Sequence, residues 1–311
     1  MQYRHVPVRH QTRKLSTKAT ALVLLGVPTG VYLYKCLMMV AFQSKLIYLP
    51  YIPLDSRHEE RTPEMSLGMD VEDVEVISAD KKKLRGMVVN PTLPSGPVMI
   101  YFQGNAGNMN HRLPLFKQMT KAVPNLTIAG ICYRGFGSSL GRPSERGLEK
   151  DAQAILDWTY RKYPERPIYL YGHSLGGGVA AYLASNPMYG DKIRGVILEN
   201  TYLSIQDMVT AIYTKWTPYP YIAKYLLWNR WPTKERIAHI SCPVLFLSSA
   251  KDEIVPPEHM ETLYRICKQH QPNSQIASMP KSMHMDMYMA DRNLYNQQVA
   301  QFLSLNERKT S

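Results

Sequence analysis

Residues Ile168–Ala180 read IYLYGHSLGGGVA. The apolar run at the start, Ile168–Tyr171, predicts a buried strand, and the small residues that end the segment suit a helix packed close to a sheet. Between them, Gly172–Gly176 match the pattern G-x-S-x-G, which is a nucleophile elbow when it joins a strand to a helix. The glycines leave room for a strained turn that exposes the Ser174 hydroxyl, and the helix N-terminus favours negative charge beside it. Because this motif also occurs by chance, the neighbouring segments have to support it.

Strands and helices alternate through most of the chain. The predicted strands cover residues 74–78, 84–89, 98–102, 126–132, 168–171, 196–198, 244–247 and 275–278, and the predicted helices cover 112–122, 147–162, 257–268 and 293–303. The first two strands form a hairpin, and the later ones alternate with helices. This order predicts an α/β fold with a mostly parallel, doubly wound sheet, in which ligands bind at the carboxyl ends of the strands.

An aromatic insertion, residues 202–239, interrupts this alternation. It contains three of the four tryptophans of the chain, together with several tyrosines and prolines. We predict that it forms a helical lid. Its aromatic residues either only pack on the sheet or also line an apolar substrate pocket, and both can hold at once.

The composition describes a globular chain with a basic N-terminal segment. Of its 311 residues, 45% are hydrophobic and 20% are charged, which fits one α/β domain of about 250 residues and an appendage. The net charge is +12, and residues 1–54 contain no acidic residue but seven basic ones, which leaves +5 for residues 55–311. The seven are Arg4, Arg9, Arg13, Lys14, Lys18, Lys35 and Lys45. We therefore relate the charge to membrane topology and expect no nucleic-acid partner.

Residues 19–42 form an apolar run with a single charge, Lys35. A helix of that length spans about 36 Å, which is enough for a bilayer, and Pro28 within it is tolerated in lipid. We predict an uncleaved signal anchor with one span. A cleaved signal peptide fits less well, because the run is long and no A-x-A-type site follows it. A mitochondrial presequence remains an alternative, because residues 1–18 are basic and free of acids.

The predicted organisation follows from this anchor. The parts are a basic tail at 1–18, a transmembrane anchor at 19–42, a linker at 43–70, the α/β domain at 71–305 and a C-terminal tail at 306–311. The positive-inside rule places the N-terminus in the cytosol and residues 43–311 on the far side of the membrane. We favour the endoplasmic reticulum or another endomembrane. The sequon Asn125–Thr127 enters a predicted strand and does not decide the topology.

Cysteine and histidine spacing offers no metal site. The four cysteines form no C-x-x-C pair, and the histidines lack a spacing such as H-E-x-x-H. We therefore expect no metal and no cofactor. Cys132 lies in a predicted strand and Cys267 in a predicted helix, so both are expected in the core.

Two further loops supply the partners that a nucleophilic serine needs. A serine hydroxyl is a poor nucleophile until a base takes its proton, and that base needs an acid to orient it. Asp252 follows the strand at 244–247 and is the expected acid, and His284 follows the last strand and is the expected base. Ser174, Asp252 and His284 each occupy a loop after a strand, and together they are stronger evidence than any one alone.

Other residues compete for these roles. Glu199, at the end of the strand at 196–198, is a rival acid. His259 and His270 lie on a predicted helix or at its end, where we expect them to be solvated.

An oxyanion hole needs two backbone N–H groups beside the serine. Leu175, directly after Ser174, supplies one, and Asn105, in the loop after the strand at 98–102, is the best placed for the other. Gly104 and Gly107 let that loop approach closely. Such donors contribute roughly 2.7–4 kcal/mol each to the stabilisation of a transition state.

Together these motifs resemble those of the membrane-anchored α/β-hydrolases of the branch marked by H-G-N-A-G-N, and especially its fungal bud-emergence-associated members. The matching stretches are Phe42–Pro50, Gly104–Asn108, Tyr133–Gly137, Pro143–Glu145, Gly172–Gly176, Ile197–Thr201, Lys251–Pro257 and Ser282–Asp286. The chain departs from the branch at Gln103, where a histidine is usual and supports the oxyanion loop, and at Met285, where asparagine is frequent. The family's nucleophile, acid and base correspond to Ser174, Asp252 and His284.

This resemblance implies a serine hydrolase of a lipid, an acylated small molecule or an acylated protein, since the relatives include protein depalmitoylases. A depalmitoylase of cytosolic proteins conflicts with the topology inferred above, so one of the two is wrong. From a different class, the alternative is a catalytically silent, membrane-tethered interaction protein in cell polarity. The intact triad favours the enzyme.

Overall fold

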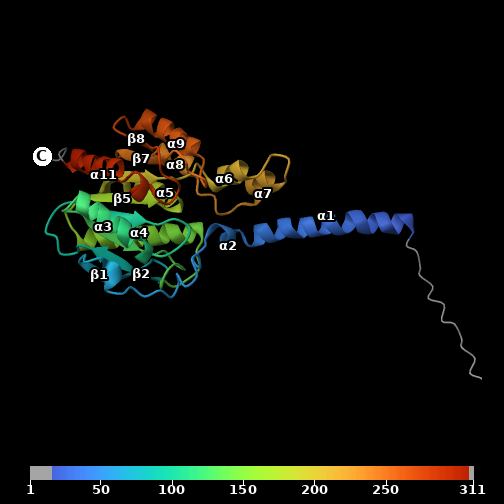
Figure 1. Ribbon diagram of the computed structural model, residues 1–311, viewed down its shortest axis with the longest axis horizontal. Helices are drawn as coiled ribbons and strands as arrows, with labels where there is room; N and C mark the ends of the chain where they lie inside the picture. Colours follow the sequence, from blue (N-terminus) through green and yellow to red (C-terminus); the bar gives the residue numbers. More distant parts are fainter. Residues whose placement is uncertain (1–15, 308–311) are drawn as a thin grey trace, which may run out of the picture. The chain divides into compact units, whose positions relative to one another are not determined.

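A computed structural model describes residues 16–307 of the chain (Figure 1). Most of the predicted tail at 1–18 and the end of the tail at 306–311 lie outside them. The chain divides into two compact units, one that ends at Phe42 and one that begins at Gln43. The first unit contains the helix α1 (Thr17–Ala41), and the second contains the α/β domain.

The α/β domain is built on one sheet. Its strands are β1 (Val71–Ile77), β2 (Lys83–Val89), β3 (Val98–Phe102), β4 (Thr127–Ile131), β5 (Ile168–His173), β6 (Ile193–Glu199), β7 (Val244–Ser249) and β8 (Gln275–Met279). Its helices are α2 (Gln43–Ile47), α3 (Leu113–Ala122), α4 (Glu145–Lys162), α5 (Leu175–Ser185), α6 (Ile205–Ile212), α7 (Tyr219–Leu226), α8 (Thr233–Ile237), α9 (Pro257–His270), α10 (Met287–Ala290) and α11 (Arg292–Glu307). Short 3-10 turns lie at Glu64–Ser66, Asn110–Arg112 and Gly190–Lys192.

The eight strands lie in the order β1-β2-β4-β3-β5-β6-β7-β8. The hairpin β1–β2 is antiparallel, as is the pair β2–β4, and all other neighbours are parallel. Parallel strands need crossover connections, and the helices between them supply these on both faces of the sheet. The predicted α/β fold with a mostly parallel, doubly wound sheet is therefore confirmed.

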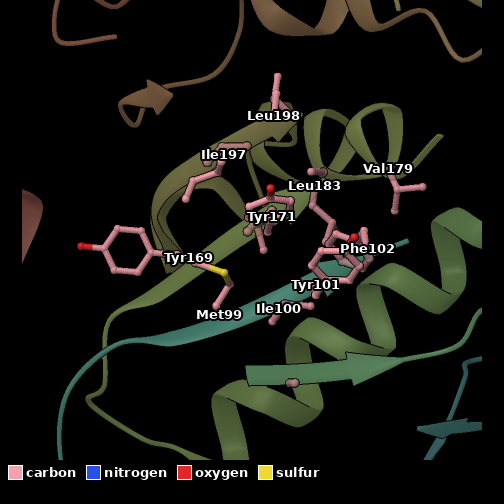
Figure 2. Close-up of a cluster of buried hydrophobic side chains, with 14 of the residues drawn as sticks. Met99, Ile100, Tyr101, Phe102, Tyr169, Tyr171, Val179, Leu183, Ile197 and Leu198 are labelled. Carbon is pink, nitrogen blue, oxygen red and sulfur yellow. The ribbon is translucent and has the colours of Figure 1, made fainter. Parts of the chain in front are cut away.

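The central strands are buried on both faces, so they read as continuous apolar runs. Every residue of β3, β4 and β5 is buried. Figure 2 shows side chains of β3, β5 and β6 packed together with Val179 and Leu183 of α5. The rings of Tyr101 and Tyr171 stack at 5.1 Å between their centroids, so the strand that leads to Ser174 is fixed by its neighbour.

Helix α1 is long, apolar and exposed. None of its 25 residues is buried, and it holds Pro28 in its interior. Within residues 16–307 it is the one helix long and apolar enough to cross a membrane. Ser16 caps its first turn, because the Ser16 Oγ accepts the Ala19 N–H at 3.2 Å.

The insertion between β6 and β7 is helical, as the sequence predicts. It contains α6, α7 and α8, and α6 and α7 lie side by side outside the sheet (Figure 1). Trp231 near its end is fully buried, and a Cβ added at Gly178 of α5 would lie 3.2 Å from the Trp231 ring. The base of the insertion therefore packs directly on the helix that follows Ser174.

Candidate active site

Ser174 occupies the sharp turn between β5 and α5. Its backbone angles, φ 52° and ψ −115°, lie in a region that costs a residue with a side chain about 1–3 kcal/mol. Neighbouring groups hold it there: its N–H donates to the Glu199 carbonyl at 2.9 Å, and its carbonyl accepts the Thr201 hydroxyl at 2.8 Å. The turn is thus tied to the end of β6, and the geometry is that of a nucleophile elbow.

The two glycines of G-x-S-x-G are required by close backbone approaches. A Cβ at Gly176 would lie 2.0 Å from the Phe102 carbonyl oxygen, and a Cβ at Gly172 would lie 2.4 Å from the Gly176 carbonyl oxygen. Neither atom belongs to a side chain that could move aside. The pattern in the sequence therefore records how closely α5 packs against β3 and β5.

The structure brings Asp252 and His284 together. The His284 Nδ1 lies 2.8 Å from Oδ2 of Asp252 and 3.0 Å from Oδ1, and both side chains are buried. The Asp252 Oδ1 also accepts the N–H groups of Ile254 at 2.9 Å and Val255 at 2.8 Å, which fix the carboxylate. A carboxylate that faces Nδ1 holds the proton on that nitrogen and leaves Nε2 free to act as a base.

Glu199, the rival acid, does not contact His284 in this way. The Tyr171 hydroxyl donates to the Glu199 Oε2 at 2.5 Å and lies 3.0 Å from the Tyr295 hydroxyl. Burial is the main reason that the pKa of Glu199 rises to about 7. A carboxyl that is partly neutral near pH 7 and bonded to a tyrosine is poorly suited to orient an imidazole. The geometry therefore favours Asp252.

The loop that carries His284 is also bonded to the elbow. The His173 Nε2 lies 3.1 Å from the His284 carbonyl oxygen, and the two rings are 5.0 Å apart between centroids. Because a carbonyl only accepts, Nε2 of His173 carries the proton. Burial lowers the pKa of His173 well below its usual value, so its ring is neutral. Within residues 16–307, the Ser174 hydroxyl itself has no hydrogen-bond partner.

Two further residues that the sequence analysis missed hold the same loop. The Glu253 carboxylate accepts the His284 N–H at 3.0 Å, and the Asn200 side chain donates to the His284 carbonyl at 3.1 Å. Glu253 directly follows Asp252, and Asn200 directly follows Glu199 at the end of β6. A position after a strand is a signal in the sequence, but the bonds to His284 join segments that are distant in sequence.

The two candidate oxyanion donors flank this turn. Leu175 is the first residue of α5, and the first N–H groups of a helix have no partner within it. Among the described residues, the Asn105 N–H donates to no backbone or side-chain acceptor either. The loop of Asn105 reaches the serine, since a Cβ at Gly104 would lie 3.6 Å from the Ser174 Cβ.

Gln103, the departure from the family pattern, supports the oxyanion loop from within. The buried side chain of Gln103 donates to the Gly107 carbonyl at 3.2 Å, and the backbone carbonyl of Gln103 accepts the Tyr133 hydroxyl at 3.1 Å. The glutamine thus holds the loop by a hydrogen bond between side chain and backbone.

The segment predicted as a linker also braces this loop. The Leu49 N–H donates to the Asn105 carbonyl at 2.8 Å, and the Asn105 side chain donates to the Ile47 carbonyl at 3.1 Å. The Gly107 N–H donates to the Ile52 carbonyl at 2.7 Å. Residues 47–52 therefore position the oxyanion loop, although they precede it by more than fifty residues in sequence.

The expectation that His259 is solvated is wrong, whereas His270 is exposed. His259 lies on the inner face of α9 and is only 8% exposed, and its Nδ1 accepts the Leu203 N–H at 3.4 Å. Burial lowers its pKa. The helical position was right, but the helix turns this residue toward the base of the lid. Cys132 and Cys267 are buried, as expected.

Apolar side chains are exposed beside the candidate triad. Ile254 lies in the acid loop, and Met283 and Met285 flank His284; about half of each side chain is exposed. A charged cleft of about 660 Å³ lies elsewhere, between β1–β2 and residues 57–61, and no residue of the triad lines it. The surface next to His284 therefore includes apolar side chains beside the exposed Glu253.

Comparison with known proteins gives matches over most of the chain. The chain is 36% identical over 286 residues to the alpha/beta hydrolase domain-containing protein WAV2 of Arabidopsis thaliana, which covers 88% of this chain and 91% of WAV2. It is 35% identical over 305 residues to the protein bem46 of Schizosaccharomyces pombe, covering 95% and 93%. The lysophosphatidylserine lipase ABHD12 of Danio rerio is 32% identical over 191 residues, covering 56% of this chain and 48% of that protein.

A family model and the solved structures agree with these matches. The model described as serine aminopeptidase, S33, matches residues 98–235, which include the elbow. The crystal structure of an alpha-beta hydrolase from Vibrio vulnificus superposes with a TM-score of 0.67 at 19% identity, covering 85% of this chain and 92% of that one. At this identity the structural likeness concerns the fold.

Proposed function

Because the chain belongs to the α/β-hydrolase family, together with WAV2 and bem46, we propose that it is a serine hydrolase of carboxylic esters or thioesters. One observation carries the proposal: the strained Ser174 turn lies beside the loop in which His284 Nδ1 meets Asp252 at 2.8 Å. A scaffold protein would have no physical need for this arrangement. The family membership supports the reaction class, and the geometry supports the choice of these residues.

In the proposed mechanism, the free Nε2 of His284 takes the proton of Ser174 while Oγ attacks the acyl carbonyl carbon. Asp252 stabilises the imidazolium that forms. The N–H groups of Leu175 and Asn105 bind the oxyanion of the tetrahedral intermediate. His284 then gives its proton to the leaving alcohol or thiol, and an acyl-enzyme remains. Water, deprotonated by His284, releases the acid by the same steps in reverse.

The proposed substrate has an apolar acyl chain. Ile254, Met283 and Met285 present apolar surface beside the triad, and ABHD12, the relative named a lysophosphatidylserine lipase, acts on a lipid ester. A monoacyl lipid at a membrane surface fits both observations. We infer that the enzyme is held at that surface by α1, which is long and apolar enough to span it.

The experiment is hydrolysis of a short acyl ester by detergent-solubilised protein. Ser174→Ala is expected to lose activity by at least a thousand-fold in kcat, since removal of a triad member leaves only the contribution of binding and the oxyanion hole. Ser185→Ala, at the far end of the same helix, serves as the control and should keep wild-type activity. Full hydrolysis by the Ser174→Ala protein would refute the proposal.

A further inference from the structure

We propose that the lid carries a bilayer-docking surface, which rests in the headgroup zone of the membrane that α1 is proposed to span. The lid surface consists of the exposed residues Ile212, Trp216, Tyr221, Tyr225, Leu226 and Trp228. The inference rests on the proposed anchoring by α1, but it does not need the catalytic proposal. It adds a second contact with lipid to the one proposed for α1.

The lid surface is more apolar and aromatic than a solvated face needs to be. Trp216 is 88% exposed and Trp228 is 56% exposed, whereas Trp231 at the base of the same insertion is fully buried. Contiguous exposed apolar patches on soluble domains mark sites of interaction. Tryptophan and tyrosine are the residues that concentrate at the membrane–water boundary, where the ring is buried and its polar atom stays wet.

The charge of the lid suits a lipid headgroup region. Residues 208–234 contain no acidic residue, but four basic ones: Lys215, Lys224, Arg230 and Lys234. The Lys215 Nζ lies 5.8 Å from the Trp216 ring centroid, and the Lys224 Nζ lies 5.1 Å from that of Tyr225. A lysine beside an aromatic ring can extend its amine to phosphate while its stem stays on apolar surface. An acidic side chain at this surface would repel the lipid phosphates that the two lysines are proposed to reach.

The chain itself brings this surface to the membrane. Gln43 is the second residue after the end of α1, and its side chain donates to the Leu226 carbonyl at 3.1 Å and accepts the Trp228 N–H at 2.9 Å. Leu226 and Trp228 are therefore hydrogen-bonded to a residue that follows the proposed span almost directly in the sequence. The end of α7 is thus hydrogen-bonded to the first residue of the second unit.

Further bonds make this connection rigid. The Tyr48 hydroxyl donates to the Asn229 Oδ1 at 3.0 Å and accepts the Trp231 Nε1–H at 3.0 Å, and the Asn229 amide donates to the Ser44 hydroxyl at 3.1 Å. Asn229 and Trp231 are almost completely buried. Trp231 also packs on α5, the helix that follows Ser174. One connected body therefore contains the lid surface, the residues that follow the proposed span, and α5. Docking would let a lipid ester reach Ser174 from the bilayer without crossing water.

Tryptophan fluorescence tests this surface without any need for activity. The full chain is reconstituted in phosphatidylcholine nanodiscs whose acyl chains are either plain or brominated, since bromine quenches only fluorophores in contact with it. Helix α1 contains no tryptophan, so the signal comes from the second unit. We expect brominated lipid to quench the wild type, and the Trp216→Phe, Trp228→Phe double variant to lose that quenching. Trp158→Phe, on α4, is the matched control and should be quenched like the wild type.

Two outcomes would overturn the proposal. Equal emission of the wild type in plain and brominated nanodiscs would show that the tryptophans do not reach lipid. The second outcome is a wild type that is not quenched by brominated lipid and that forms dimers in detergent, while the Trp216→Asp, Trp228→Asp variant forms none. This result would assign the surface to a second copy of the chain.

A kinetic comparison separates this inference from the catalytic proposal. We expect the Trp216→Asp, Trp228→Asp variant to hydrolyse a lipid ester in nanodiscs at least tenfold more slowly than wild type, and a soluble short ester within twofold of it. Equal losses on both substrates would count against docking. If the wild type hydrolyses neither ester, the catalytic proposal fails, while the quenching result still decides the docking surface.

Discussion

In the catalytic proposal, Asp252 is the acid that orients His284. Asp252 contacts Nδ1 of the ring, whereas Glu199 is bonded to Tyr171. We expect Asp252→Asn to lower kcat roughly ten-thousand-fold, because an amide holds the imidazole in the wrong tautomer. Glu199→Gln is expected to change kcat less than tenfold. A larger loss in Glu199→Gln than in Asp252→Asn, measured with one short ester, would reverse the assignment.

The raised pKa of Glu199 predicts a separate effect, on the pH dependence of stability. Its folded-state pKa, about 7, lies above its ordinary value of 4.5, so the folded protein holds this proton more tightly than the unfolded chain. The resulting stabilisation is complete below about pH 4.5 and is lost as the pH rises through 7. Relative to Glu199→Gln, the wild type should therefore lose up to about 3 kcal/mol of unfolding free energy between pH 5 and pH 8.

Thermal denaturation of both proteins across this pH range measures the effect. Glu261→Gln, an exposed position on α9, is the control and should follow the wild type at every pH. Parallel curves for the wild type and Glu199→Gln would mean that Glu199 is ionised throughout.

At the scale of an element, the elbow depends on how closely α5 approaches β3. A Cβ at Gly176 would meet the Phe102 carbonyl at 2.0 Å, whereas a Cβ at Gly178 meets only side-chain atoms, at 3.2 Å. We expect Gly176→Ala to destabilise the protein by about 3 kcal/mol or more, since the backbone of a packed sheet has to move. Gly178→Ala should stay within about 1 kcal/mol of wild type, because a small clash is offset by better helix propensity. Denaturation midpoints of the two variants compare them directly, and equal midpoints would contradict the close approach.

The elements that carry local patterns could be predicted from the sequence. The strand before Ser174, the strands before Asp252 and His284 and the order of helices all follow from apolar runs and glycine spacing, and the α/β-hydrolase fold is confirmed. The braces of the site could not be predicted in this way. Gln43 bonds to Trp228 and Leu49 to Asn105, and such pairs depend on how distant segments meet. The burial of His259 was missed because a short helical pattern does not show which face packs inward.

At the scale of the whole molecule, the proposed membrane anchoring would decide which substrates the site can reach. The charge distribution predicts that the N-terminus lies in the cytosol and the second unit on the far side. In sealed microsomes we expect a tag after Ser311 to resist protease until detergent is added, and a tag before Met1 to be removed at once. The reverse pattern would place the site in the cytosol and admit acylated cytosolic proteins as substrates.

The proposal that Ser174 is an activated nucleophile is tested most directly by labelling with a fluorophosphonate probe. The probe reacts with a serine only when a base and an oxyanion hole activate it. The full chain in detergent is compared with Ser174→Ala and His284→Ala, and Ser185→Ala is the control. We predict covalent label on the wild type and on Ser185→Ala, and none on the other two. Label that persists in Ser174→Ala, or no label on a folded wild type, would contradict the account.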